Sequence, residues 1–496
     1  MTPPFLLAVD QGTSSTKTII FDRQGGIVAA ATSDLASEYP RAGFVEQDPA
    51  EIHRSVVESV AACAALFRDR GESLSDLAAC GISNQRETFL LWDRGGAPLC
   101  RAISWQCERS VAVCERLRAE GQSGEITSRT GLVLTPYFSG TKLLWLMEND
   151  PDIRRAVQDG NAFFGTVDTW LLHRLTGGKC YATDHTNASR TLLFNIDTLA
   201  WDTELLSRWG LSGLRLPAAH PSVHPFGETD FGGALPRALP IAAMIGDSHA
   251  AAFGEGCTRP GMAKVTIGTG SSVLVNVGGR RRVAGGGIVS TVCYSLPEGV
   301  QYALEGIIVS CAATIAWMRD QLGLFSDSAE TETMARGAGD SQGVYVIPAF
   351  SGLGSPHWKM NLKASIHGLS FASSKNHVVR AALESIPYQI ADVMEAIAAS
   401  GGIAPAELRV DGGMTANSFV MQLLADIVPA PVITIGTANV SALGAAALAG
   451  LGAGVYRSID DLGGLAQEKR RYGAGPDEAQ AQRGYAGWKA LLASLI

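Results

Sequence analysis

Residues 5–21 read FLLAVDQGTSSTKTIIF, two short apolar runs joined by a turn of Gly, Thr and Ser. The first run ends at Asp10, the second begins at Lys17, and a third apolar run covers residues 27–32 after the polar turn 22–26. Short β-type runs separated by tight turns predict a β-hairpin followed by a third strand. Apolar positions at helical spacing then predict a helix over residues 49–67.

A similar pattern returns about half a chain later. Residues 263–267 are apolar and lead into the turn GTGSS at 268–272, and a second apolar run covers residues 273–277. Two strand–turn–strand units at this separation form a weak internal repeat. The repeat predicts an α/β protein with two domains of similar build, which we expect at residues 1–253 and 254–496.

The composition excludes several classes of protein. Of 496 residues, 46% are hydrophobic and 18% are charged, which is enough apolar material for sizeable cores. The net charge of -8 argues against a nucleic-acid partner, because such proteins usually carry a basic footprint. We expect a cytoplasmic protein without membrane insertion, since neither a signal-peptide pattern nor a bilayer-length apolar run is present. Nine cysteines without a Cys-x-x-Cys pair favour buried thiols over a metal site.

The two Gly/Thr/Ser turns are candidates for binding phosphate. A tight turn between strands can point backbone N–H groups and hydroxyls at an anion, although such residues are common in any hairpin. No Gly-x4-Gly-Lys-Ser/Thr phosphate loop occurs in the chain. Asp10 lies at a strand end beside the first turn, where it is suited to hold Mg2+ directly or through water.

A third glycine-rich element reads LRVDGGMTANSF at residues 408–419. It predicts a strand, a tight turn and a helix start. The glycines at 412 and 413 would let a flat group such as adenine approach the backbone closely. The alternative is an ordinary strand-to-helix turn in which Asn417 caps the helix.

Long co-linear motifs identify a relationship that covers essentially the whole chain. They include VDQGTSSTK (9–17), GISNQRET (81–88), SWQCERS (104–110), PYFSGTKLLWL (136–146), TDHTNASRTLLFNI (183–196), PAFSGLGSPHW (348–358) and LRVDGGMTANSF (408–419). The sequence resembles the FGGY family of carbohydrate kinases, and within it the glycerol kinases most closely. The resemblance implies two ribonuclease-H-like domains of the actin and hexokinase type that flank a catalytic cleft. It also implies ATP-dependent, Mg2+-requiring phosphorylation of a terminal hydroxyl of a small polyol, with glycerol the first choice.

The resemblance further implies a role for individual residues of this chain. Arg86 and Glu87 would bind substrate hydroxyls, since a guanidinium donates to hydroxyl oxygens and a carboxylate accepts from hydroxyl protons. Tyr137 would add a polar wall, and Trp105 would line the carbon backbone of the substrate. Asp247 would be the catalytic aspartate. The residues implied to contact ATP or its phosphates are Thr13, Ser14, Ser15, Lys17, Gly268, Thr269, Ala312, Ala316, Gly413 and Asn417.

Several positions depart from the pattern of the glycerol kinases. Ser248 replaces a glutamine that touches the substrate, and Ser272 replaces a phenylalanine that packs on it. Lys17 and Glu108 each replace an arginine, and Ala312 and Ala316 replace a glycine and a glutamine on the adenine side. The two serines would enlarge and wet the pocket. A kinase for a larger polyol or ketose, such as erythritol or a pentulose, is therefore the alternative.

A second alternative comes from another class, an actin- or chaperone-like ATPase that uses nucleotide to switch partner binding. That class shares the fold, and a fold does not determine function. Arg86, Glu87, Trp105 and Tyr137 argue against it, because such an ATPase has no use for a polyol pocket. We also expect a homo-oligomer, either a dimer or a tetramer.

Overall fold

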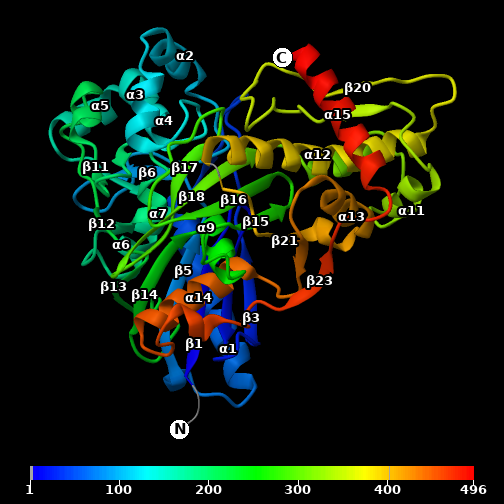
Figure 1. Ribbon diagram of the computed structural model, residues 1–496. Helices are drawn as coiled ribbons and strands as arrows, with labels where there is room; N and C mark the ends of the chain where they lie inside the picture. Colours follow the sequence, from blue (N-terminus) through cyan, green and yellow to red (C-terminus); the bar gives the residue numbers. More distant parts are fainter. Residues whose placement is uncertain (1–3, 402) are drawn as a thin grey trace. The chain divides into compact units, whose positions relative to one another are not determined.

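The computed structural model describes residues 4–401 and 403–496, which group into two compact units (Figure 1). The first unit comprises Met1–Gly256, Thr291–Tyr302 and Asn439–Ala466. The second comprises Cys257–Ser290, Ala303–Ala438 and Gln467–Ile496. The expected division at 253/254 stays a prediction.

The first unit is built on a six-stranded sheet in the order β13-β14-β5-β1-β2-β3. β1 pairs antiparallel with β2 and parallel with β5, and β5 pairs parallel with β14. The bounds are β1 Phe5–Gln11, β2 Ser15–Phe21, β3 Ile27–Asp34, β5 Leu77–Asn84, β13 Val223–Thr229 and β14 Leu239–Gly246. The hairpin and third strand that residues 5–32 predict are confirmed.

Helices cover both faces of this sheet. Leu7 and Val9 of β1 pack with Ile52 of α1 in one apolar core. Leu6, whose side chain points the other way along the strand, lies close to Gly450 of α14. Figure 1 shows α14 beside β1 and β5. The central strands are therefore buried on both sides, as parallel strands usually are.

The remaining elements of the first unit are short strands and helices. Helix α1 confirms the helix expected from residue 49; Asp48 caps it by accepting from the N–H of Ala50. The helices are α1 Pro49–Asp69, α2 Val111–Ala119, α3 Ser123–Thr130, α4 Ser139–Asn149, α5 Pro151–Gln158, α6 Val167–Leu175, α7 His185–Ala188, α8 Thr203–Arg208, α9 Asp247–Gly254 and α14 Val440–Gly452. The small strands are β4 Glu46–Gln47, β6 Phe89–Trp92, β7 Ala102–Ile103, β8 Phe163–Thr166, β9 Ala182–Asp184, β10 Phe194–Asn195, β11 Ala200–Trp201 and β12 Ala218–His220.

The second unit repeats the same strand pattern. Its sheet runs β17-β18-β16-β15-β21-β22-β23, with β15 antiparallel to β16 and parallel to β21. Most of β17 and the first residues of β18 fall in the segment Thr291–Tyr302, which groups with the first unit. The segment β18-β16-β15-β21-β22 corresponds to β3-β2-β1-β5-β14, so the internal repeat and the ribonuclease-H-like fold are confirmed. The strands are β15 Met262–Ile267, β16 Ser271–Gly278, β17 Val289–Leu296, β18 Gly299–Ile308, β19 Tyr345–Ile347, β20 Ser365–His367, β21 Glu407–Asp411, β22 Val432–Ile435 and β23 Glu468–Tyr472. The helices are α10 Ala312–Asp320, α11 Glu330–Gly337, α12 Lys375–Gly401, α13 Ser418–Ile427 and α15 Glu478–Leu495.

The parallel strands of the first sheet bring their carboxyl ends into register. Asn84 at the end of β5 pairs with Gln11 of β1 on one side and with Gly246 of β14 on the other. Open α/β sheets bind ligands at this edge. The segments that follow these three residues carry the predicted phosphate turn, Arg86 and Glu87, and Asp247.

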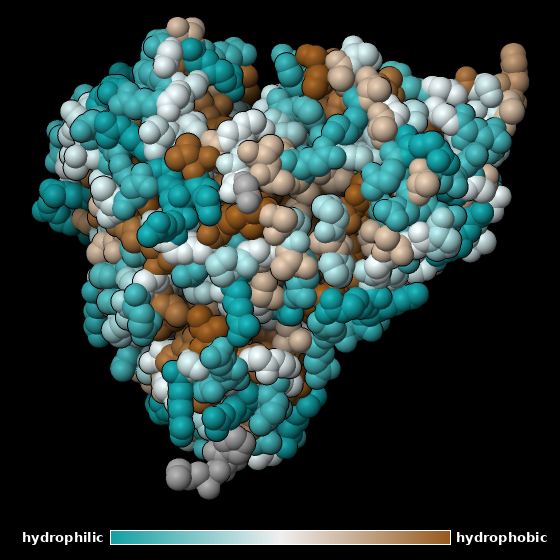
Figure 2. Space-filling view, viewed as in Figure 1, coloured by the Kyte–Doolittle hydropathy of each residue, from teal (hydrophilic) through white to brown (hydrophobic). Residues whose placement is uncertain are grey.

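The surface in Figure 2 intersperses small apolar groups with hydrophilic side chains. None of the helices in residues 4–401 and 403–496 combines the length and apolar character needed to cross a bilayer.

Three histidines of the first unit are wholly or partly buried, which disfavours their charged form. The rings of His220 and His224 stack with centroids 3.8 Å apart, and Nδ1 of His185 lies 3.1 Å from Oγ of Ser295. Burial lowers the pKa of His185 to about 4, and neighbouring His220 adds to the effect. Burial also lowers the pKa values of His220 and His224.

These histidines should make stability depend on pH. The unfolded chain takes up a proton at His185 below about pH 6.5, whereas the native protein does not until about pH 4, so stability falls as pH is lowered through that window. We expect His185→Gln to reduce the loss of stability between about pH 7 and about pH 5 by about 2 kcal/mol, at about 1.4 kcal/mol per pH unit within the window. The measurement is the difference in Tm between about pH 7 and about pH 5 for both proteins. An equal drop in Tm for the wild type and the variant would contradict the role given to His185. Burial raises the pKa of Asp168 to about 6, which makes stability rise as pH is lowered, but this effect is the same in both proteins.

Candidate active site

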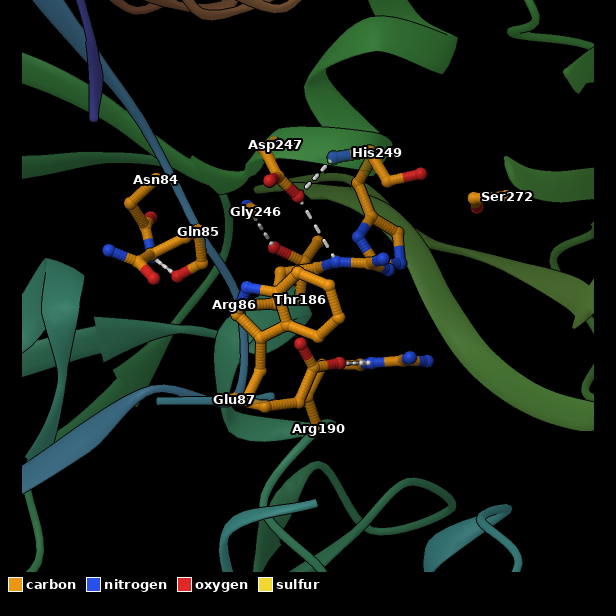
Figure 3. Close-up of polar contacts among 12 residues, drawn as sticks. Asn84, Gln85, Arg86, Glu87, Thr186, Arg190, Gly246, Asp247, His249 and Ser272 are labelled. Carbon is orange, nitrogen blue, oxygen red and sulfur yellow. Dashed lines mark hydrogen bonds and ion pairs between the residues drawn. The ribbon is translucent and has the colours of Figure 1, made fainter. Parts of the chain in front are cut away.

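Arg86 and Asp247 meet at the carboxyl ends of β5 and β14. Nε of Arg86 lies 3.2 Å from Oδ1 of Asp247, and the arginine side chain is buried while the carboxylate is partly exposed. The stem of Arg86 packs on Gly246, where a Cβ would come within 2.7 Å of it. Glycine at 246 thus allows the guanidinium to reach the carboxylate that begins α9. Figure 3 shows this pair together with the groups that support it.

Glu87 follows Arg86 and is almost completely buried. Its backbone has a φ of +62°, a conformation that non-glycine residues rarely adopt. Oγ of Ser139 donates to its carbonyl at 2.7 Å, and Nε of Arg190 lies 2.6 Å from its carboxylate. Glu87 is therefore held at both its backbone and its side chain.

Trp105 and Tyr137 form an aromatic wall in the same unit. Their ring centroids are 5.5 Å apart, and both side chains are half-buried. Nζ of the buried Lys142 donates to the carbonyls of Ser104 and Tyr137, each at 3.0 Å. Burial lowers the pKa of Lys142 to about 8. The lysine thus joins the two segments that present the rings.

The turn between β1 and β2 closes on itself through a hydrogen bond from the N–H of Gly12 to the carbonyl of Ser15, 2.9 Å long. Nε1 of Trp105 donates to Oγ1 of Thr13 at 2.9 Å. The structure therefore links the predicted substrate wall to the predicted phosphate turn. Ser14 lies in the same turn, and its carbonyl accepts from the N–H of Leu35.

Asp10 and Lys17 are cross-strand partners on β1 and β2. Burial raises the pKa of Asp10 to about 6; a hydrogen bond from Ser83 and the charge of Lys17 oppose the shift, while Asp247 adds to it. A divalent cation would relieve the repulsion between the two carboxylates, and oxygen ligands are those that Mg2+ prefers. The residues present therefore fit a magnesium site at Asp10.

The second predicted phosphate turn is joined to a helix within the second unit. The N–H groups of Cys311 and Ala312 donate to the carbonyls of Thr269 and Gly268, at 2.8 and 3.0 Å. α10 begins there, and Ala316 lies one turn further along on the same half-buried face. The turn and the two alanines are thus brought together.

The glycine-rich element at 408–419 forms the predicted strand, turn and helix. Gly412 has a φ of +96°, and a Cβ there would lie 2.4 Å from the carbonyl of Ile267, so the turn requires glycine. A Cβ at Gly413 would meet no heavy atom within 4 Å. Asn417 caps α13 by accepting from the N–H of Val420 at 3.2 Å. The cap at Asn417 is therefore confirmed, and the nucleotide contacts of Gly413 and Asn417 stay predictions.

A buried carboxylate that sequence reasoning missed supports the substrate side. Asp184 accepts from Thr186, Asn187 and Ser222, and none of these four residues is exposed. Oγ1 of Thr186 in turn accepts from the N–H of Gly246 at 2.9 Å, next to Asp247.

The sequence analysis assigned no role to three buried charged residues of the site, Lys142, Asp184 and Arg190. The motifs PYFSGTKLLWL and TDHTNASRTLLFNI contain them. A signal was available in the first motif, because a lysine beside Leu143 and Leu144 at the start of an apolar helix is unusual unless its charge is satisfied.

Comparisons with known proteins show which family models and sequences the chain resembles. Models for the N-terminal and C-terminal domains of the FGGY family of carbohydrate kinases match residues 5–254 and 263–453. The chain is 43% identical to a glycerol kinase from Shewanella sp. (strain ANA-3), covering 99% of both chains. It is 42% identical to a glycerol kinase from Carboxydothermus hydrogenoformans, covering 99% of this chain and 97% of the other.

Solved structures show the same fold. A glycerol kinase from Plasmodium falciparum with ADP superposes with a TM-score of 0.91 at 31% identity, covering 99% of this chain and 98% of that one. A xylulose kinase from Lactobacillus acidophilus has a TM-score of 0.89 at 22% identity, over 99% and 98% of the two chains, which shows a shared fold.

Proposed function

Since the chain belongs to the FGGY family of carbohydrate kinases, we propose that it transfers the γ-phosphoryl group of ATP to a terminal hydroxyl of a small polyol, with glycerol the first choice. The observation that carries this is the cluster of Arg86, Glu87 and Asp247 at the strand ends, beside the wall of Trp105 and Tyr137. The names of the similar proteins support glycerol over other polyols.

In this proposal each polar group handles one part of the substrate. Arg86 donates to hydroxyl oxygens and Glu87 accepts hydroxyl protons. Asp247 accepts the proton of the attacking hydroxyl, and Arg86 keeps its carboxylate oriented through the 3.2 Å contact. The aromatic wall keeps water away from the reacting phosphoryl group, because water would otherwise compete with the substrate hydroxyl as nucleophile.

The two Gly/Thr/Ser turns provide the proposed binding site for the phosphates of ATP. Thr13, Ser14, Ser15 and Lys17 bind phosphates in the first unit, and Gly268 and Thr269 do so in the second. Ala312, Ala316, Gly413 and Asn417 contact the nucleotide. Mg2+, held at Asp10 directly or through water, would neutralise charge on the phosphates. Phosphoryl transfer requires mainly such positioning and charge stabilisation.

The proposed function is tested by a coupled ADP-release assay with glycerol, erythritol, ribitol, xylulose and ribulose. We expect glycerol to give the highest kcat/KM. ADP release that no polyol or ketose stimulates would contradict the proposal.

The alternative of a larger substrate depends on Ser248 and Ser272. Oγ of Ser272 donates to the buried carboxylate of Glu305 at 2.9 Å, within the second unit. Its proton is therefore engaged, which favours a pocket with spare room over one that binds an additional hydroxyl. We propose glycerol as a substrate with a raised KM.

The double substitution Ser248→Gln with Ser272→Phe restores the residues found in glycerol kinases. We expect kcat/KM for glycerol to rise about tenfold, because one apolar contact is worth about 1–3 kcal/mol. Erythritol should be a poor substrate for both forms. A wild-type preference for erythritol that collapses in the double variant would overturn glycerol as the substrate and promote the larger polyol.

We also propose that the chain forms a homo-oligomer, either a dimer or a tetramer. Leu369 and Phe371 supply exposed apolar side chains on the segment before α12, which supports a contact between copies. Multi-angle light scattering measures the molar mass directly, and a single species near 52.1 kDa would refute the proposal.

A further inference from the structure

Glu87 and Arg190 form an ion pair that is removed from solvent on both sides. The exposed fractions of the two side chains are 2% and 0%, and Nε of Arg190 lies 2.6 Å from Oε1 of Glu87 (Figure 3). Removing either partner of such a pair leaves an uncompensated buried charge, which is strongly unfavourable. Both partners are therefore needed for the stability of this part of the fold.

The surroundings of Arg190 fix its direction. Its guanidinium lies 5.0 Å from the ring centroid of Phe138, and the backbone N–H of Arg190 donates to the backbone carbonyl of Asn187 at 3.0 Å. Asn187 is itself hydrogen-bonded to the buried carboxylate of Asp184. The arginine thus projects from a rigid segment that follows α7.

The backbone and side chain of Glu87 are also fixed by their contacts. The backbone of Glu87 is in the left-handed region at φ +62° and is anchored by Ser139. Such backbone strain occurs mostly where the surrounding structure imposes a functional geometry. Since Oε1 is held by Arg190, the plane of the carboxylate and the direction of Oε2 are also fixed.

We propose that Arg190 is a positioning residue for the phosphoryl-transfer reaction, which holds Glu87 ionised and oriented to accept substrate hydroxyls. This inference rests on the proposed function, in which Glu87 binds the polyol. An arginine is charged at every working pH, so its partner stays a carboxylate and acts only as an acceptor. A protonated or rotated Glu87 would present a donor, or no partner, to the hydroxyl.

The test is a double-mutant cycle on Arg190→Met and Glu87→Gln, with KM and kcat measured for the best substrate of the polyol panel. We expect Arg190→Met to raise the polyol KM at least about tenfold while the KM for ATP stays within about twofold. In the Glu87→Gln background the same substitution should change the polyol KM by less than about threefold, because the group it positions is gone. Arg190→Lys keeps the charge without the planar fork, and we expect an intermediate KM.

Controls separate positioning from general damage. Arg109 is a buried arginine paired with Glu46 at 2.5 Å, and Arg109→Met should lower Tm without raising the polyol KM. If near-ultraviolet circular dichroism shows that Arg190→Met is unfolded, the same comparison of polyol KM is made with Arg190→Lys, alone and combined with Glu87→Gln. A polyol KM that rises equally in both backgrounds, or not at all, would overturn the inference. Failure of the proposed function is a different result, in which the wild-type protein phosphorylates no polyol and Glu87→Gln changes nothing.

Discussion

Asp247→Asn should lower kcat by about 10²- to 10⁴-fold, the range typical for the loss of a general base. Asparagine has nearly the same shape, but it cannot take the proton of the attacking hydroxyl. The N–H of Ser248 donates to Oδ1 of Asp247 at 2.6 Å, and Arg86 contacts the same atom. The amide oxygen of asparagine can keep these contacts, so the protein should fold and bind ATP normally.

The measurement is kcat from the coupled assay together with the Kd for ATP and the melting curve. Asp93→Asn serves as a matched control, because Asp93 caps a surface turn by accepting from the N–H of Ala97. Its kcat should stay within about twofold of wild type. A folded Asp247→Asn protein with near-normal turnover would remove Asp247 from the role of base.

The second large effect is expected at Gly444, where α14 crosses α9. A Cβ at this position would lie 1.9 Å from the carbonyl oxygen of Ala250, and one at Gly254 would lie 2.2 Å from that of Val440. Neither neighbour is a flexible side chain, so the helices would have to separate. We expect Gly444→Ala to lower the free energy of unfolding by about 3 kcal/mol.

Because Asp247 is the first residue of α9, this displacement should also lower kcat. Gly124→Ala is the control: it lies inside α3, where a Cβ would meet nothing within 4 Å. It should be neutral or stabilising by up to about 1 kcal/mol, owing to the helix propensity of alanine. Urea denaturation measures the free energy of unfolding of both variants. Equal values would contradict the close crossing of α14 and α9.

Local sequence patterns were enough to predict the strands and turns that frame the site. The runs around Asp10 and Gly268 alternate with tight turns, and hairpins depend on such short-range signals. The motifs also place Arg86, Glu87, Trp105, Tyr137 and Asp247 within the first unit, where the structure brings Arg86 next to Asp247 and Trp105 next to Tyr137.

Long-range contacts could not be predicted in this way. Glu87 and Arg190 are 103 residues apart in the chain, and no periodicity links them. The helix at Val440–Gly452 packs on the first sheet although it lies near the end of the sequence. Buried polar pairs and helix crossings depend on the tertiary fold, which composition and spacing do not reveal.

In the proposed reaction the γ-phosphoryl group passes to a polyol hydroxyl and not to water. Phosphorus-31 nuclear magnetic resonance of the protein with ATP, Mg2+ and glycerol measures this directly. We predict one new phosphomonoester resonance, from phosphate attached to the terminal carbon of glycerol, formed in a one-to-one ratio with ADP and about 10²- to 10⁴-fold more slowly by Asp247→Asn. Inorganic phosphate formed in that ratio, with no phosphomonoester of any tested polyol, would show an ATPase and contradict the account.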